Sequence, residues 1–175
     1  FLDPRKVVND YLRGKRKNIL NPVSFLILSI TIYLIGDSLI DVSSVANENN
    51  SEVYSAGREA GRFVKTNFKY FWILSILWLS VATKLVFQTY NYAEHLAISA
   101  FVLGQSTLIG TIGFALFKLP LLFNPVIYIL MLWMMYKIFD TQQSKLSALS
   151  KSIGATILFC IQLFVLVVLI GIIKS

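Results

Sequence analysis

The stretch Asn91-Tyr92-Ala93-Glu94-His95-Leu96 holds the residue types best suited to chemistry. His95 is the only histidine of the chain, and Glu94 beside it is one of nine acidic residues. A carboxylate next to an imidazole could bind a cation, shuttle a proton or act as an acid/base pair. At helical spacing, a stripe of polar and small residues continues from this pair along one side of the following segment: His95, Ser99, Ser106, Gly110 and Gly113.

Two interpretations of this stripe stay open. It could line a polar path through a membrane, or its small residues could let neighbouring helices approach closely while the hydroxyls bond across helices. Glu94 could likewise help to start a helix, where negative charge suits the helix dipole. One histidine, one glutamate and the single cysteine Cys160 are too few for a metal cluster, so we expect no metal and no cofactor in this chain.

The densest charge of the chain lies in Tyr11-Leu12-Arg13-Gly14-Lys15-Arg16. Arginine can hold a phosphate through two parallel hydrogen bonds, so Lys15 and Arg16 could form a lipid head-group site. The alternative is a topology anchor, in which each basic residue contributes about 1 kcal/mol near an anionic surface. The patch is too short, and too close to an apolar segment, to predict nucleic-acid binding.

The amino-acid composition indicates that membrane-spanning segments must position these residues. Of 175 residues, 56% are hydrophobic and only 14% are charged, with a mean hydropathy of +0.68. Soluble domains carry roughly 25% charged residues, so a water-exposed surface could not be built from this chain without large bare apolar patches. The chain is therefore predicted to be an integral membrane protein, which excludes soluble folds, cytosolic enzymes and disordered tails.

Five apolar segments are each close to the roughly 20 residues that a helix needs to cross a bilayer core of about 30 Å. They lack the alternating polarity of β-barrel strands, and helices satisfy their own backbone hydrogen bonds in lipid. We expect an all-α polytopic transmembrane bundle of about five spans. The spans lie at about 22–40, 70–87, 96–117, 121–139 and 153–173.

Two domains follow from this division. Residues 1–20 are predicted to form a basic, amphipathic interfacial segment, in which Asp3 caps a short helix, Pro4 occupies its first position and Gly14 ends it. Residues 21–175 form the transmembrane domain, with a polar outer loop over 41–67 whose part 52–65 could be helical.

Three further expectations concern polar residues at span starts and within spans. Asn21-Pro22 and Asn124-Pro125 are interpreted as ordinary helix starts. Gln105 and Gln162 lie inside spans and are expected to bond to neighbouring helices.

The basic residues predict the orientation. An N-terminus inside places ten lysines and arginines in the cytoplasm and six outside, with the strongest bias directly before the first span. We therefore expect a cytoplasmic N-terminus and an outside C-terminus.

The two motifs together resemble a bacterial polytopic inner-membrane family of unknown function. Tyr11-Leu12-Arg13-Gly14-Lys15-Arg16, followed by Asn21-Pro22, resembles that family's entry signature, Tyr-Leu-x-Gly-Lys-Arg and then Asn-Pro. The stretch from Asn91 to Leu96 resembles its second signature, Asn-Tyr-x-Glu-His-Leu. The resemblance implies the inner (cytoplasmic) membrane and motif residues Tyr11, Gly14, Lys15, Arg16, Pro22, Tyr92, Glu94 and His95, but no reaction. Family members often carry a zinc ribbon ahead of this region, so zinc would belong only there.

Three functions are compatible with these features. The leading hypothesis is a non-enzymatic accessory or scaffold subunit that engages a protein partner, a second copy of itself or anionic lipid at its cytoplasmic face. The alternative is a small channel or transporter subunit whose polar path includes Ser99, Ser106 and Gly110. A lipid-modifying enzyme using Glu94 and His95 is the third hypothesis, and it lacks a visible nucleophile or metal set.

Overall fold

The computed structural model describes residues 3–15, 17, 19–39, 63, 66–119, 121–140 and 144–174. Over these ranges it is helical and contains no strand. Most of the expected outer loop 41–67, including its expected helix, lies outside the described residues. The described helices are α1 (Pro4–Leu12), α2 (Pro22–Leu39), α4 (Phe68–Phe87), α5 (Tyr92–Phe117), the 3-10 helix η1 (Leu121–Phe123), α6 (Pro125–Phe139) and α7 (Lys145–Lys174).

The helix lengths confirm an all-α membrane bundle. Four helices, α2, α4, α5 and α7, are long and apolar enough to cross a membrane. The apolar α6 has 15 residues, which at about 1.5 Å per residue is roughly 22 Å and shorter than a bilayer core. It begins later than the apolar run because Asn124 caps it, while η1 covers the preceding residues. In contrast, α5 and α7 begin before the apolar runs that predicted them, because the polar residues ahead of these runs continue the helix.

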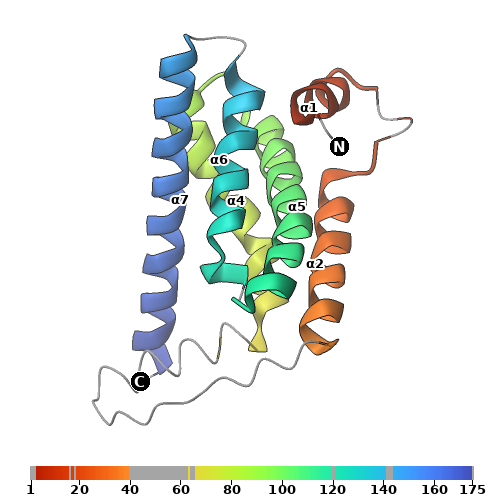
Figure 1. The fold of residues 1–175 in the computed structure, drawn as a ribbon. Helices are drawn as coiled ribbons and strands as arrows, with labels where there is room; N and C mark the ends of the chain where they lie inside the picture. Colours follow the sequence, from red (N-terminus) through yellow and green to blue (C-terminus); the bar gives the residue numbers. More distant parts are fainter. Residues whose placement is uncertain are drawn as a thin grey trace.

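The central helix of the bundle is α5, which packs against α2, α4 and α6. Outside this group, α7 packs against α4 and α6. Figure 1 shows the long helices running side by side, with α1 seen nearly end-on, so that α1 crosses them at one end of the bundle. This end, called the α1 end below, also holds the starts of α2, α5 and α7 and the ends of α4 and α6.

The short helix α1 has the predicted start and stop. The Asp3 side chain accepts a hydrogen bond from the Lys6 N–H (3.3 Å), Pro4 is the first helical residue, and Gly14 follows the helix with a φ of +84°. Its apolar face was expected to lie on lipid, but Val8 is 1% exposed. The face rests on α5 and α6 instead, because the ends of these helices offer an apolar protein surface at the same level.

The closest approach of α2 to α5 depends on a glycine. A Cβ atom added to Gly104 would lie 2.7 Å from Cδ1 of Phe25 and 3.3 Å from the Cα of Leu26. Small residues allow such backbone contacts between membrane helices. On another side of α5, the indole N–H of Trp72 on α4 donates to the Thr107 hydroxyl (2.8 Å), and both side chains are buried.

Candidate functional site

The second motif starts helix α5 through a reciprocal pair of hydrogen bonds. The Asn91 side chain accepts from the Glu94 N–H (2.8 Å), and the Glu94 carboxylate accepts from the Asn91 N–H (2.7 Å). This capping box satisfies two backbone donors that the first turn of a helix leaves unpaired. Glu94 therefore has the helix-starting contact that one of the two sequence interpretations expected. Tyr92, at the first position of the helix, is 46% exposed.

His95 is fully buried between α4 and α6. Its Nδ1 lies 3.0 Å from the Thr83 hydroxyl, which itself donates to the Ser80 carbonyl (3.1 Å). Because the single hydroxyl proton of Thr83 is used in that bond, His95 Nδ1 must carry the proton that joins the two side chains. The imidazole ring stacks on Phe139, with ring centres 5.8 Å apart, and meets the edge of Tyr90 at 6.1 Å.

The stripe that follows His95 on α5 turns inward along its whole length. Ser99 and Ser106 are fully buried, and over the described part of the chain neither hydroxyl, nor Nε2 of His95, has a hydrogen-bond partner. The glycines of the stripe lie against η1 and α6: a Cβ at Gly110 would overlap Ile127. The glycines of the stripe therefore form a contact between helices, while the Ser99 and Ser106 hydroxyls have no partner among the described residues.

The loop between α4 and α5 is held at its centre by a lysine. The ammonium group of Lys84 donates to the Tyr90 carbonyl (2.6 Å). Burial raises the pKa of the Tyr90 phenol, the Glu94 carboxylate raises it further, and the Arg13 guanidinium opposes both effects. Tyr90 thus remains neutral at physiological pH.

An arginine that was not singled out from the sequence fastens α1 to the bundle. The Arg5 side chain donates from Nε to the Lys137 carbonyl (2.7 Å), and its Nη2 lies 3.2 Å from Oδ2 of Asp140 at the end of α6. Tyr11 adds an edge-on ring contact to Phe101 of α5 (5.4 Å). Arg5 was counted only as one more charge, because nothing in a single sequence pairs residues 135 positions apart.

The first motif leaves its charges at the surface. Arg13, Lys15 and Lys17 are exposed, and Arg16 lies outside the described residues. We call residues 13–17 the basic turn. Lys15 stands 3.5 Å from a carboxylate oxygen of Asp10, yet its side chain is 72% exposed, so the ion pair covers little of its charge.

Pro22 of the same motif is buried at the start of α2. There the Asn21 side chain accepts from the Val23 N–H (3.0 Å), which is the expected helix start. Asn124 caps α6 in the same manner and is also buried, where its amide donates to the Gly110 carbonyl of α5 (3.2 Å). This second bond was not predicted, because an isolated Asn-Pro pair indicates only a helix start.

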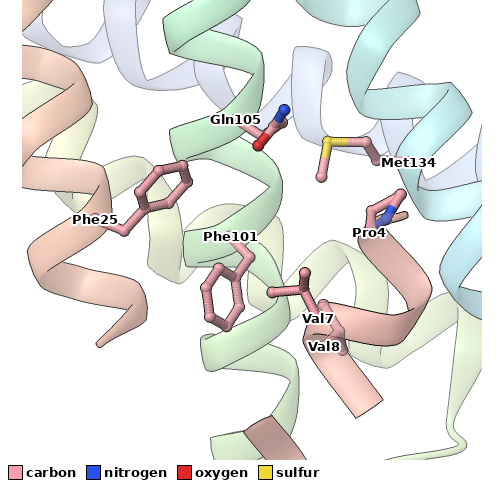
Figure 2. Close-up of a pocket in the computed structure, with 7 residues that line it drawn as sticks. All are labelled: Pro4, Val7, Val8, Phe25, Phe101, Gln105 and Met134. Atoms are coloured by element: carbon pink, nitrogen blue, oxygen red, sulfur yellow. The ribbon is translucent and has the colours of Figure 1, made fainter. Parts of the chain in front are cut away.

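A small, partly open crevice lies between α2 and α6. Helix α5 forms the floor of the crevice, and helix α1 closes one of its ends (Figure 2). Figure 2 shows its lining, which is apolar except for one amide: Pro4, Val7, Val8, Phe25, Phe101, Gln105 and Met134. The expectation that Gln105 bonds to a neighbouring helix is wrong for the described residues, among which its side chain has no hydrogen bond, because α2 and α6 present only apolar groups to it here.

Neither motif forms a metal centre within the described ranges. No three histidine, cysteine, aspartate or glutamate side chains there lie close enough together to hold an ion. The described residues of the two motifs instead present an exposed set of cations and a buried imidazole, beside an apolar crevice with one free amide.

A family model described as "Protein of unknown function (DUF3667)" matches residues 1–34. The matched stretch contains the first motif, Asn21-Pro22 and part of α2, and the second motif lies beyond it. No curated protein and no solved structure is detectably similar to the chain.

Proposed function

We propose that the chain is a non-enzymatic integral membrane protein whose α1 end engages anionic lipid head groups. The observation that carries this proposal is the exposure of the basic turn, with Arg13, Lys15 and Lys17 free of buried partners. Polybasic segments beside a membrane helix attract anionic lipids at about 1 kcal/mol per basic residue.

The position of α1 supports a role beyond general attraction. Its apolar side packs on α5 and α6, and Arg5 ties it to the end of α6. Arg13, the C-cap residue of α1, and Lys15, whose N–H donates to the Asp10 carbonyl, therefore follow a helix that is fixed to the bundle. Charges that are held in place lose less entropy when they bind a head group.

The proposed location is the bacterial inner membrane, with the α1 end in the cytoplasm. Described basic residues at the α1 end outnumber those at the other end, where Lys69, Lys118 and Lys174 lie. Such a bias favours a cytoplasmic α1 end. A fluorescent protein fused after residue 175 should stay dark if the C-terminus is outside, and bright fluorescence would contradict this orientation.

Lipid selectivity in proteoliposomes tests the proposal. Spin-labelled phosphatidylglycerol should be immobilised by the protein more strongly than phosphatidylcholine, and the preference should weaken with added salt because the charges are exposed. The pair Arg13→Gln/Lys15→Gln should lower the preference about five-fold or more, since 1 kcal/mol corresponds to about five-fold.

The pair Lys69→Gln/Lys118→Gln is the matched control, because it removes the same charge from exposed lysines at the other end. It should lower the preference by less than half as much. Equal losses in both pairs would show attraction to net charge alone and would refute a lipid site at the α1 end. If a protein co-purifies with the original chain, and the Arg13→Gln/Lys15→Gln pair loses this protein while its lipid selectivity is unchanged, the result would instead favour a protein partner.

The unpaired polar atoms of α5 favour one alternative function. Ser99, Ser106 and Nε2 of His95 form a buried row without hydrogen-bond partners among the described residues, and such rows can serve a channel or transporter subunit. His95 is packed against Phe139 and Tyr90, which opposes an open path at this position. Ion flux through reconstituted protein that disappears in the variant Ser99→Ala/Ser106→Ala would support the alternative.

A further inference from the structure

His95 joins α5 to two other elements at the α1 end. It bonds through Nδ1 to the Thr83 hydroxyl of α4 (3.0 Å), and its ring stacks on Phe139, the last residue of α6, with ring centres 5.8 Å apart. The ring also meets the edge of Tyr90 in the turn between α4 and α5 (6.1 Å). Phe139 in turn stacks on Phe87, the last residue of α4, with ring centres 3.9 Å apart. We call these five residues the histidine joint.

The packed joint has no place for a second proton on His95. Because Nδ1 carries the proton that joins the ring to Thr83, Nε2 is a lone pair. The side chain is 0% exposed, and Nε2 has no hydrogen-bond partner over the described part of the chain. A proton bound there would create a buried cation and a buried N–H donor without an acceptor, and both are costly. The packed joint therefore holds the neutral imidazole.

The charged and titratable groups around the ring do not form an ion pair with it. Lys84 of α4 repels a positive ring, and Glu94 of α5 attracts one. The Glu94 carboxylate is already used as the acceptor of the Asn91 N–H in the capping box. From the turn and from α6 the ring meets the phenol of Tyr90 and the hydrocarbon ring of Phe139. A cation at this position would thus lack a bonded counter-ion among the described residues.

The joint lies next to the contacts that fasten α1. Asp140, which follows Phe139 directly, pairs with Arg5 of α1 (3.2 Å), and the Lys137 carbonyl accepts from Arg5 Nε (2.7 Å). Figure 1 shows α1 beside the same end of the bundle at which α6 ends. A movement of Phe139 away from His95 would therefore displace the segment to which Arg5 is bonded.

We propose that the histidine joint is an acid-sensitive switch. At neutral pH the imidazole is uncharged and the joint stays packed. In acid, an opened joint exposes the ring to water, where it takes up a proton, and the open form is therefore favoured. Opening releases the end of α6 and loosens the hold on α1. This switch goes beyond lipid binding and does not depend on it.

Proton linkage gives the size of the effect. An exposed imidazole has a pKa of about 6.5, and the packed joint excludes the charged form. The joint is therefore at full stability above this pH and loses stability as the pH falls below it. Between pH 7.5 and 5.5 the population of the open joint should rise about ten-fold. His95 is the only histidine of the chain, so no other side chain ordinarily titrates between these two values.

The single histidine makes its protonation directly observable. In nitrogen-15 NMR of the full chain in micelles, labelled in the histidine ring, the packed form should be neutral with its proton on Nδ1. It should stay neutral at pH 5.5, where an exposed imidazole is about nine-tenths charged. A ring that titrates near pH 6.5 while the structure around it stays protected from exchange would overturn the switch.

Hydrogen exchange with mass spectrometry measures the opening. The full chain in micelles is labelled at pH 7.5 and 5.5, with labelling times scaled for the intrinsic pH dependence of amide exchange. After this correction, amides at the start of α5 and the end of α6 should exchange about ten-fold faster at pH 5.5, and those of α1 should accelerate with them. Residues 155–170 of α7 should not change. Absence of the acceleration, or an equal acceleration in α7, would refute a local switch.

Two variants separate the buried imidazole from charge in general. His95→Asn keeps an amide donor where Nδ1 stands but takes up no proton, so it should remove the pH dependence. The matched control, His95→Asn/Thr89→His, adds an imidazole at an exposed position of the adjacent turn and should also show none. A pH dependence that returns in this control would assign the effect to net charge and contradict the switch. If His95→Asn does not fold, the NMR and exchange measurements on the unmodified chain still decide the question.

Discussion

Two sides of helix α5 treat their polar groups in opposite ways. Towards α4, Thr107 accepts from the Trp72 indole and Nδ1 of His95 bonds to Thr83, so these two side chains find partners within the protein. Towards the crevice between α2 and α6, the Gln105 amide has no partner among the described residues. The first side therefore adds hydrogen bonds between helices to the bundle, and the second side adds mainly apolar contacts.

This contrast gives polar residues in membrane helices two separate meanings. A polar group that is hydrogen-bonded across helices stabilises the bundle. A polar group without a partner, such as the Gln105 amide or the Ser99 and Ser106 hydroxyls among the described residues, adds no such bond. The predictions below follow this division, from changes that should damage the contacts between helices to changes that should spare the fold.

The largest expected effect is at the contact between α5 and α6. A Cβ at Gly110 would overlap the buried Ile127, so Gly110→Ala should lower the free energy of unfolding by about 1–3 kcal/mol through overpacking. Unfolding in detergent, followed by circular dichroism, measures this loss. Gly154→Ala on α7 is the control, because nothing lies within 4 Å of its added Cβ. Equal stability of both variants would contradict the assigned contact.

The next effect concerns the paired side of α5. Thr107→Val removes the acceptor of the Trp72 indole and leaves a buried N–H unsatisfied. Cross-helix hydrogen bonds in membrane proteins average about 0.6 kcal/mol, and unsatisfied buried donors cost about 1–3 kcal/mol. The midpoint of thermal unfolding should fall measurably. Ser38→Ala, at an exposed serine of α2, should leave it unchanged.

Much of this arrangement could be predicted from the sequence. The apolar runs indicate membrane helices because hydrophobicity is a property of each segment alone, and Asp3-Pro4 indicates a helix start for the same reason. The inward stripe of α5 could also be predicted from its periodicity. The contacts between distant residues could not be predicted. No local signal pairs Arg5 with Asp140, and none indicates that Gln105 lines a crevice while Thr107 accepts from an indole.

The lengths of the helices show a second limit of sequence reasoning. Hydropathy identifies the apolar part of a segment, but a helix continues through polar residues until a cap or a break. The helix α7 therefore starts at Lys145, although its apolar run was placed at 153. Hydropathy also does not report burial: 56% of the apolar window of α5 is buried and only 22% of that of α7, although the window of α7 is the more hydrophobic.

A smaller effect is expected where α1 joins the bundle. Arg5→Gln removes the contacts to Lys137 and Asp140. Partly exposed ion pairs contribute about 0.2–1 kcal/mol, so α1 amides should exchange their hydrogens with solvent about two- to five-fold faster. Hydrogen exchange with mass spectrometry measures this. Lys6→Gln, at an exposed lysine of the same helix, should not change the exchange rate, and a similar acceleration would remove the role given to Arg5.

The smallest effect on stability separates binding from folding. Lys15 pairs with Asp10 at 3.5 Å but is largely exposed, so Lys15→Gln should leave the unfolding midpoint unchanged. The same variant should still reduce phosphatidylglycerol selectivity, because the lost charge belongs to the basic turn. A loss of stability without a loss of selectivity would assign Lys15 to the fold instead.

The most direct test of lipid binding at the α1 end is photo-crosslinking in a bilayer. Phosphatidylglycerol with a diazirine in its head group should label the segment around the exposed Arg13 and Lys15 more strongly than the exposed Lys69 and Lys118 at the other end. Excess unlabelled phosphatidylglycerol should suppress the labelling at the α1 end, and phosphatidylcholine should not. Equal labelling at both ends of the bundle, insensitive to either competitor, would contradict a preference of the α1 end for anionic lipid.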